Sequence, residues 1–208
     1  MSEAHGTGHE HRGAVPMSRL EAFSDGVFAI AATLLILDVT ATSSPLSTEL
    51  LRIWPSYVAY AVTFITIGIV WINHGTVLSL IKETDRTFLT LNILLLTVIA
   101  FVPFPTRLLA AHLFDEDARA ATLLYGITLV IGATIFTSLW FYGALHRRLL
   151  KPTADEHLVQ GISRSYLPGP FLYLGGTLVA LYSPMLSAAI FMAIALFYLV
   201  EATIFARG

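Results

Sequence analysis

The sequence predicts an all-α, polytopic membrane protein with six transmembrane helices, and three observations lead to this fold class. Of its 208 residues, 56% are hydrophobic and only 12% are charged, whereas an ordinary soluble domain has about 25% charged residues. The mean hydropathy is +0.74. The apolar residues also gather into six stretches, each near the roughly 20 residues that a helix needs to cross a bilayer.

Composition and charge exclude several other classes. A chain with so few charged residues lacks the polar surface of a soluble globular protein of this size. The formal net charge of −2 gives no basic surface for nucleic acid, so no nucleic-acid partner is expected. The sequence contains no cysteine, which excludes disulfides, thiolate catalysis and cysteine metal sites. We therefore expect the chain to reside in a lipid bilayer.

The six predicted spans are joined by short connections, apart from residues 147–164, and leave no room for a separate soluble domain. The first eighteen residues are polar and contain no apolar segment of the kind found in a cleavable signal peptide. We expect residues 1–17 to form a disordered cytoplasmic tail and residues 18–208 to form one six-helix transmembrane domain. The spans run over residues 19–41, 53–80, 87–113, 118–146, 165–182 and 185–205.

Local motifs place several helix ends. Ser18 and Glu21 have the spacing of a capping box, which predicts that the first helix begins there. Thr84 or Asp85 is positioned to cap the third span. Prolines should kink or interrupt two later spans, because proline cannot donate a backbone hydrogen bond. These prolines are residues 103, 105, 168 and 170.

The basic residues predict the orientation of the chain in the membrane. With the N-terminus inside, nine Lys and Arg residues fall on the inner side and three on the outer side, a bias that favours this orientation. We therefore expect a multi-pass protein of the cell membrane with both termini cytoplasmic. The acidic segment Asp115-Glu116-Asp117 then lies on the outer side.

Neither a metal site nor an enzyme site is predicted. His5, His9 and His11 of the tail could bind a metal, but nothing fixes their geometry, so we favour a solvated tail. The ionisable groups in the spans are too few and too scattered for catalysis, and no catalytic residue or cofactor is expected. These groups are Asp25, His74, Arg107 and Glu201.

The first span differs from the others because it combines charged residues with a regular apolar stripe. At about 100° per residue, Ser24 and Asp25 fall away from the stripe, and Thr33 lies at its margin. An ionisable group in a bilayer needs a partner or water, so Asp25 is expected to be a buried carboxylate on the other side of the helix. The stripe consists of Arg19, Phe23, Gly26, Ile30, Leu34, Leu37 and Ala41.

The stripe allows two interpretations. Its apolar residues can pack on a neighbouring helix, as in a coiled-coil-like bundle. Alternatively, several copies of the helix can meet on a symmetry axis, so that the stripe lines a pore with hydrophobic constrictions. Periodicity alone favours helix packing, because most apolar stripes in membrane helices have that role.

The first span also carries a long motif. Arg19-x-x-x-Phe23-Ser24-Asp25, followed by Gly-Val-Phe-Ala-Ile, resembles the signature of the transmembrane protein 175 family, which comprises prokaryotic and lysosomal potassium channels. Trp71-Ile-Asn-His74 resembles a motif in the second helix of that family, and Asn92 with Pro103-Phe-Pro105-Thr106 resembles its third helix. The likeness extends over all six spans, and the first motif is the most specific.

The resemblance implies a potassium-permeable homotetramer whose pore is lined by the first helix of each subunit, with K+ as the permeant ion and no cofactor. Prokaryotic members of the family have one six-helix repeat and assemble as tetramers. Carried over to this chain, Ile30, Leu34 and Leu37 are the pore-lining and gate residues, and Thr33 is the candidate for selectivity. These positions coincide with the stripe, so the resemblance favours the pore interpretation.

The resemblance further implies that the signature residues hold the fold instead of touching the ion. Arg19 and Asp25 are six residues apart and cannot pair on one helix face, so each is expected to bond to a neighbouring helix. Trp71 could stack on Arg19 or donate its indole N–H. The structural network is expected to contain Arg19, Phe23, Ser24, Asp25, Trp71, His74 and Asn92.

Two polar side chains of the first span have alternative interpretations. Four Thr33 hydroxyls could supply oxygen ligands to an ion, or each hydroxyl could bond back to the carbonyl of Ala29. Asp38 could form an outer ring that concentrates cations, or it could cap the segment from Thr40 to Thr42. The choice for Asp38 stays open.

Two other functions are alternatives to a channel. A secondary transporter would favour inverted repeats and broken helices around a midplane site, and no internal repeat relates residues 19–113 to residues 118–206. A non-conducting structural membrane protein differs from a channel only in its lack of ion flux.

Overall fold

The computed structural model describes residues 16–41, 43–145 and 149–205. Within these residues the regular structure is helical, apart from one antiparallel bridge between Ile81 and Leu150, which confirms the all-α class. Most of the predicted tail, with its three histidines, lies outside the described residues. The helices are α1 (Met17–Leu34), the 3-10 helix η1 (Leu35–Asp38), α2 (Leu46–Arg52), α3 (Trp54–Leu80), α4 (Arg86–Phe101), α5 (Pro103–His112), α6 (Ala118–Ala144), α7 (Glu156–Tyr166), α8 (Gly169–Val179) and α9 (Pro184–Phe205).

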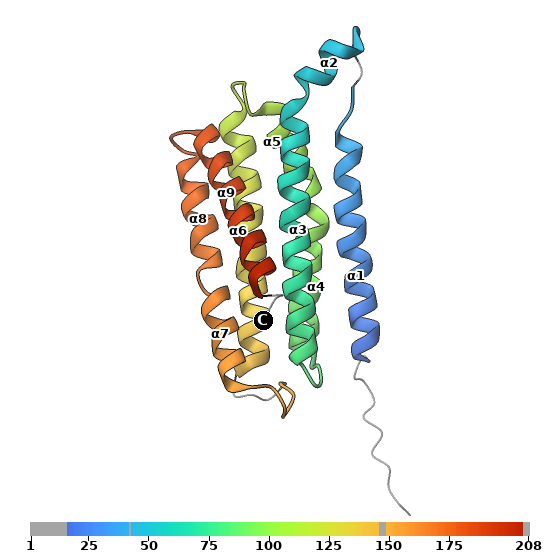
Figure 1. The fold of residues 1–208 in the computed structure, drawn as a ribbon, viewed down its shortest axis with the longest axis vertical. Helices are drawn as coiled ribbons and strands as arrows, with labels where there is room; N and C mark the ends of the chain where they lie inside the picture. The colour runs from blue at the N-terminus through green and yellow to red at the C-terminus, as the bar shows by residue number, and fades with distance from the viewer. Residues whose placement is uncertain (1–15, 42, 146–148, 206–208) are drawn as a thin grey trace, which may run out of the picture.

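The long helices lie side by side along one axis, with α1 at one edge of the bundle and α2 projecting beyond its end (Figure 1). Helices α4 and α5 follow one another as a single interrupted helix. Pro103 at the start of α5 has no N–H with which to continue the backbone ladder, so the interruption occurs where the prolines predict it. The hydroxyl of Thr106 donates a hydrogen bond of 2.9 Å to the Val102 carbonyl beside this break.

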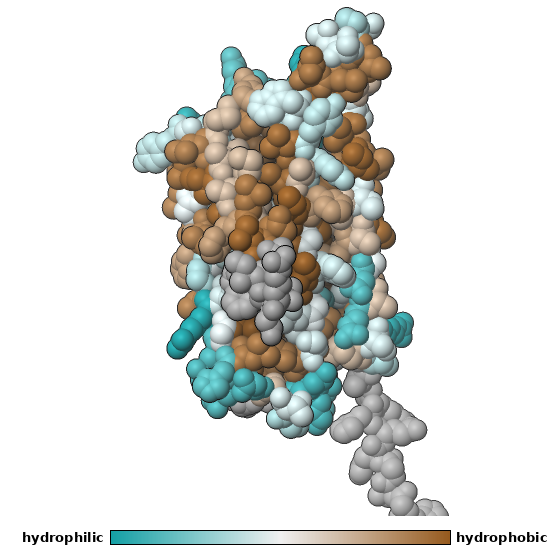
Figure 2. Space-filling view, viewed as in Figure 1, coloured by the Kyte–Doolittle hydropathy of each residue, from teal (hydrophilic) through white to brown (hydrophobic). Residues whose placement is uncertain are grey.

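Within the part of the chain that the structure describes, four helical segments are long and apolar enough to cross a membrane: Met17–Leu37, Trp54–Leu80, Arg86–His112 and Ala118–Ala144. The fifth predicted span is not one continuous helix, because α7 ends at Tyr166 and α8, with 11 residues, begins at Gly169. Helix α9 has 22 residues. On the face drawn in Figure 2, apolar residues cover the middle of the bundle and hydrophilic residues gather towards its lower end. This distribution is that of a membrane protein.

The start of α1 differs from the prediction. The helix begins at Met17, after Pro16, and no side chain caps it. The Pro16 carbonyl accepts the N–H of Leu20 at 3.2 Å, so the first helical turn already includes Ser18. The capping box of Ser18 and Glu21 is therefore wrong, because a residue inside the first turn cannot act as its N-cap.

The start of α4 follows the prediction for Asp85. The Asp85 carboxylate accepts the backbone N–H of Phe88 at 2.9 Å, which is the bond of an N-cap. Its second oxygen accepts a 2.6 Å hydrogen bond from the hydroxyl of Tyr142 near the end of α6. One carboxylate thus caps α4 and joins it to α6.

Among the described residues, two apolar clusters hold the bundle together. The larger one lies between α1, α3, α4 and α6 and includes Phe28 and Trp140, while the smaller one joins α5, α6 and α9 around Phe191. Glycine allows the close approach at the second cluster. A Cβ built on Gly126 of α6 would lie 2.8 Å from Phe191 Cζ, and one built on Gly176 of α8 would lie 2.9 Å from Phe191 Cε1. Small residues at such positions are how membrane helices pack closely.

Candidate functional site

Helix α1 packs against the bundle with one face only. Its buried residues recur every three or four positions, which is the spacing of one side of an α-helix, and they meet α3 and α4. All but one of these residues are apolar. The buried positions are Leu20, Ser24, Phe28, Ala31 and Leu35.

The apolar stripe of α1 is directed away from the core of the chain. Ile30 is 61% exposed, Leu34 42% and Leu37 67%, and Phe23 near the start of the stripe is 60% exposed. Because α1 lies at the edge of the bundle (Figure 1), the described part of the chain leaves these side chains largely uncovered. In a membrane, their cover therefore comes from lipid or from another protein molecule.

A buried hydrogen-bond chain fixes the inward face of α1. Asn92 on α4 donates from Nδ2 to the hydroxyl oxygen of Ser24 at 3.2 Å, and its Oδ1 lies 2.7 Å from Nε2 of His74 on α3. Since the Asn92 oxygen can only accept, the His74 Nε2 carries the proton and donates. All three side chains are at most 1% exposed, so the chain links three helices away from solvent. The ring of Phe28 lies 5.4 Å from that of His74.

A second hydrogen bond joins α1 to α3 at the surface. Indole Nε1 of Trp71 donates to Oδ1 of Asp25 at 2.8 Å, which is the second of the two roles considered for Trp71. Asp25 is exposed, so the expected buried carboxylate is wrong. The position that faces the core is Ser24, one residue earlier and therefore about 100° around the helix.

The seven signature residues thus fall into three groups. The structure brings Ser24, His74 and Asn92 together, and it pairs Asp25 with Trp71. Arg19 and Phe23 are exposed and take no part in these hydrogen bonds. Among the described residues, the Arg19 side chain has no hydrogen-bond or ion-pair partner.

The hydroxyl of Thr33 lies within hydrogen-bond distance of two backbone carbonyls, those of Ala29 and Ile30, each at 3.0 Å. The back-bond considered from the sequence is therefore present. It uses the hydroxyl hydrogen and leaves oxygen lone pairs free to accept, so it does not prevent the exposed oxygen from binding a cation. The side chain of Asp38 and residue Thr42 lie outside what the structure describes, as does the side chain of Glu201.

One buried polar group was missed by the sequence analysis. The hydroxyl oxygens of Thr63 on α3 and Tyr125 on α6 lie 3.1 Å apart, and the Thr106 hydroxyl of α5 lies 3.3 Å from that of Thr63. These three side chains join α3, α5 and α6. Their signal in the sequence is weak, because a single hydroxyl in an apolar helix usually bonds back to its own backbone.

Comparisons with known proteins agree with these features. Residues 19–103 match the sequence model of the family described as "Endosomal/lysosomal potassium channel TMEM175". The chain is 42% identical to a potassium channel of Chamaesiphon minutus over 86% of its own length and 92% of that protein. It is 38% identical to a potassium channel of Streptomyces collinus over 86% and 90%, respectively. A crystal structure of a lysosomal potassium-selective channel TMEM175 homologue from C. minutus superposes with a TM-score of 0.82, 37% identity, and coverage of 89% of this chain and 97% of that one.

We predict that Asn92→Ala lowers the thermal stability of the protein in detergent more than Thr97→Ala does. Loss of the Asn92 amide leaves His74 and Ser24 buried without these hydrogen bonds. This lowers the free energy of unfolding by about 1–3 kcal/mol for each unsatisfied group. Thr97 is an exposed residue of the same helix that bonds only to the carbonyl of Ile93. Melting temperatures followed by tryptophan fluorescence compare the two variants. Equal shifts would contradict a role for the buried chain in holding α1.

Proposed function

The chain belongs to the TMEM175 family of ion channels, and on that basis we propose that it conducts potassium ions across the cell membrane along a path lined by α1. The observation that carries this proposal is the continuous apolar stripe on α1, exposed over several turns while the opposite polar residue Ser24 is buried. In a bilayer either lipid or another copy of the chain can cover such a stripe, and membership of a channel family favours another copy.

We infer that the channel is a homotetramer. One chain supplies a single α1 at the edge of its bundle (Figure 1), which can form only one wall of an ion path. Cyclic symmetry closes such a path by repeating the same surface around an axis. Four copies, the number that the family resemblance implies, would direct the four stripes at that axis and bury their exposed apolar side chains.

The membrane topology that we propose has six crossings. Helices α7 and α8 each have 11 residues, which rise only about 17 Å each, but they follow one another along the bundle (Figure 1). Indole Nε1 of Trp140 on α6 donates to the hydroxyl of Ser163 on α7 at 2.9 Å, which holds α7 in line with the bundle. With α9 as the sixth crossing, both termini lie on the side rich in Lys and Arg, the cytoplasmic side.

The stripe provides a physical basis for a gate. Rings of Ile30, Leu34 and Leu37 around a narrow axis would exclude water, and a pore without water does not conduct ions. Thr33, at the margin of the same stripe, is exposed and could present four hydroxyl oxygens to a potassium ion that has lost part of its hydration shell. Hydroxyl ligands in one layer supply fewer contacts than stacked carbonyl rings, so we expect modest selectivity.

The assembly is tested by native mass spectrometry of the detergent-solubilised protein. We predict a mass of four chains of 22.7 kDa each, because a closed path needs more than one α1 and four is the number that the family resemblance implies. The bound detergent is removed in the gas phase, so the peak reports the number of chains directly. A stable monomer that still conducts potassium would refute the shared pore.

Conduction and the gate are tested together in planar bilayers. We predict a potassium current for the purified protein and a larger current in the closed state after Ile30→Asn, because a polar ring hydrates a constriction that isoleucine keeps dry. Ile36→Asn is the matched control: Ile36 is also exposed, at 49%, but lies off the stripe. Equal effects of the two variants would show that the constriction does not lie at Ile30. A flux that saturates at low turnover would indicate a carrier instead of a channel.

The role of Thr33 is tested by reversal potentials under bi-ionic conditions. Thr33→Val keeps the size of the side chain but removes its oxygen, so we predict a lower potassium-to-sodium permeability ratio. Thr33→Ser keeps both the oxygen and the back-bond, and should preserve the ratio. If the valine variant has the same ratio as the parent protein, the hydroxyl serves only the backbone.

A further inference from the structure

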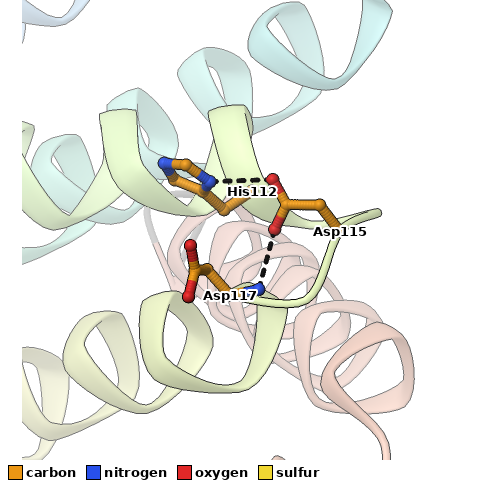
Figure 3. A group of neighbouring side chains, drawn as sticks. All are labelled: His112, Asp115 and Asp117. Atoms are coloured by element: carbon orange, nitrogen blue, oxygen red, sulfur yellow. Dashed lines mark hydrogen bonds and ion pairs between the residues drawn. The ribbon is translucent and has the colours of Figure 1, made fainter.

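The turn between α5 and α6 gathers three side chains that can bind a metal. His112 is the last residue of α5, while Asp115 and Asp117 belong to the turn before Ala118. One ligand atom from each of the three lies within 4.8 Å of the other two. Figure 3 shows the Asp115 carboxylate between the His112 ring and the backbone of Asp117. No other such group occurs among the residues that the structure describes.

The hydrogen bonds of the turn hold two of these ligands in place. Nδ1 of His112 lies 2.8 Å from Oδ2 of Asp115, and the other carboxylate oxygen accepts the backbone N–H of Asp117 at 2.9 Å. Two ligand atoms of a tetrahedral zinc ion, with bonds of roughly 2.05 Å, lie about 3.3 Å apart. The hydrogen-bonded Nδ1 and Oδ2, at 2.8 Å, would therefore separate by about 0.5 Å when the metal takes the place of the hydrogen between them.

We propose that His112, Asp115 and Asp117 form a binding site for a divalent transition-metal ion of the Zn2+ class. Two carboxylates balance the charge of the ion, and the imidazole supplies the nitrogen ligand that zinc favours over calcium and magnesium. Metal binding at Nδ1 requires the neutral imidazole with its single proton on Nε2, so a proton on Nδ1 either moves to Nε2 or is released to solvent. The imidazole is what distinguishes this site from an acidic surface that merely concentrates cations.

The site is open to solvent. The side chains of His112 and Asp115 are 37% and 50% exposed, so both can be reached by a hydrated ion. A cavity of about 710 Å³ adjoins the turn and is lined by Asp115, Glu116 and Arg119 together with the α8–α9 turn. Water from this cavity can complete the coordination shell, as it does at zinc sites with three protein ligands.

This site revises the expectation that the chain has no metal site, and it is independent of the proposed conduction. A bound ion would join the end of α5 to the start of α6. It would therefore raise the melting temperature of the whole chain, because a ligand that binds only the folded state stabilises it.

Zn2+ titration of the full-length protein tests the site. All measurements use a background protein that carries His5→Ala, His9→Ala and His11→Ala, because the histidines of the N-terminal tail would compete for Zn2+. The protein is first treated with EDTA to remove bound metal. Isothermal titration calorimetry should give one Zn2+ per chain, with a rise in melting temperature that Mg2+ does not reproduce. His112→Ala and Asp117→Asn each remove a metal ligand. Each should weaken Zn2+ binding by at least about 10–100-fold, which is the loss that follows removal of a residue hydrogen-bonded to a ligand.

Glu116→Gln is the matched control, because it removes the same charge from the same turn as Asp117→Asn without removing a ligand. It should leave Zn2+ affinity nearly unchanged. Equal weakening by the two variants, or unchanged binding after His112→Ala, would overturn the proposal and show that the turn only concentrates cations. Melting temperatures in EDTA identify any variant that is misfolded, and His112→Gln replaces His112→Ala in that case.

Discussion

The hydrogen-bond chain from Ser24 through Asn92 to His74 is the constraint on which the placement of α1 depends. Within a bilayer there is no water to satisfy a polar side chain, so each of these groups must find its partner on another helix. The three residues come from α1, α4 and α3, and only one rotation of α1 about its axis brings Ser24 to Asn92. That rotation turns Ile30, Leu34 and Leu37 outward. The exposed stripe is thus a consequence of the buried polar bonds.

Because α1 lies at the edge of the bundle, its rotation decides which of its side chains stay uncovered by the rest of the chain. A helix in the centre of a bundle has its whole circumference covered, whereas α1 has α3 and α4 on one side and no described helix over its stripe (Figure 1). The side chains left uncovered are large and apolar and form one continuous row. In a bilayer such a row is covered by lipid or by another copy of the chain, and membership of a channel family favours another copy.

Sequence patterns were most informative where one interaction dominates. The periodicity of α1 located its apolar stripe, although periodicity alone favoured packing on a neighbouring helix. Asp85 was one of two candidate caps, and Pro103 marked the break before α5. Ser18 failed as a cap because Pro16 starts the helix earlier, and Asp25 failed as a buried residue because its partner Trp71 lies at the surface. The group at His112 was overlooked although its residues lie within one short segment, because their ligand atoms meet only where α5 ends and the chain turns towards α6.

The contacts of α1 differ between its two halves. Ser24 and Asp25 hold the N-terminal half by directional hydrogen bonds, whereas the buried residues beyond Phe28 are Ala31 and Leu35, which make only apolar contacts. Apolar burial is not directional and tolerates small shifts that a hydrogen bond does not. The helix also changes to 3-10 geometry at Leu35. A rearrangement of α1 that keeps its polar bonds is therefore confined to the half that carries Leu34 and Leu37.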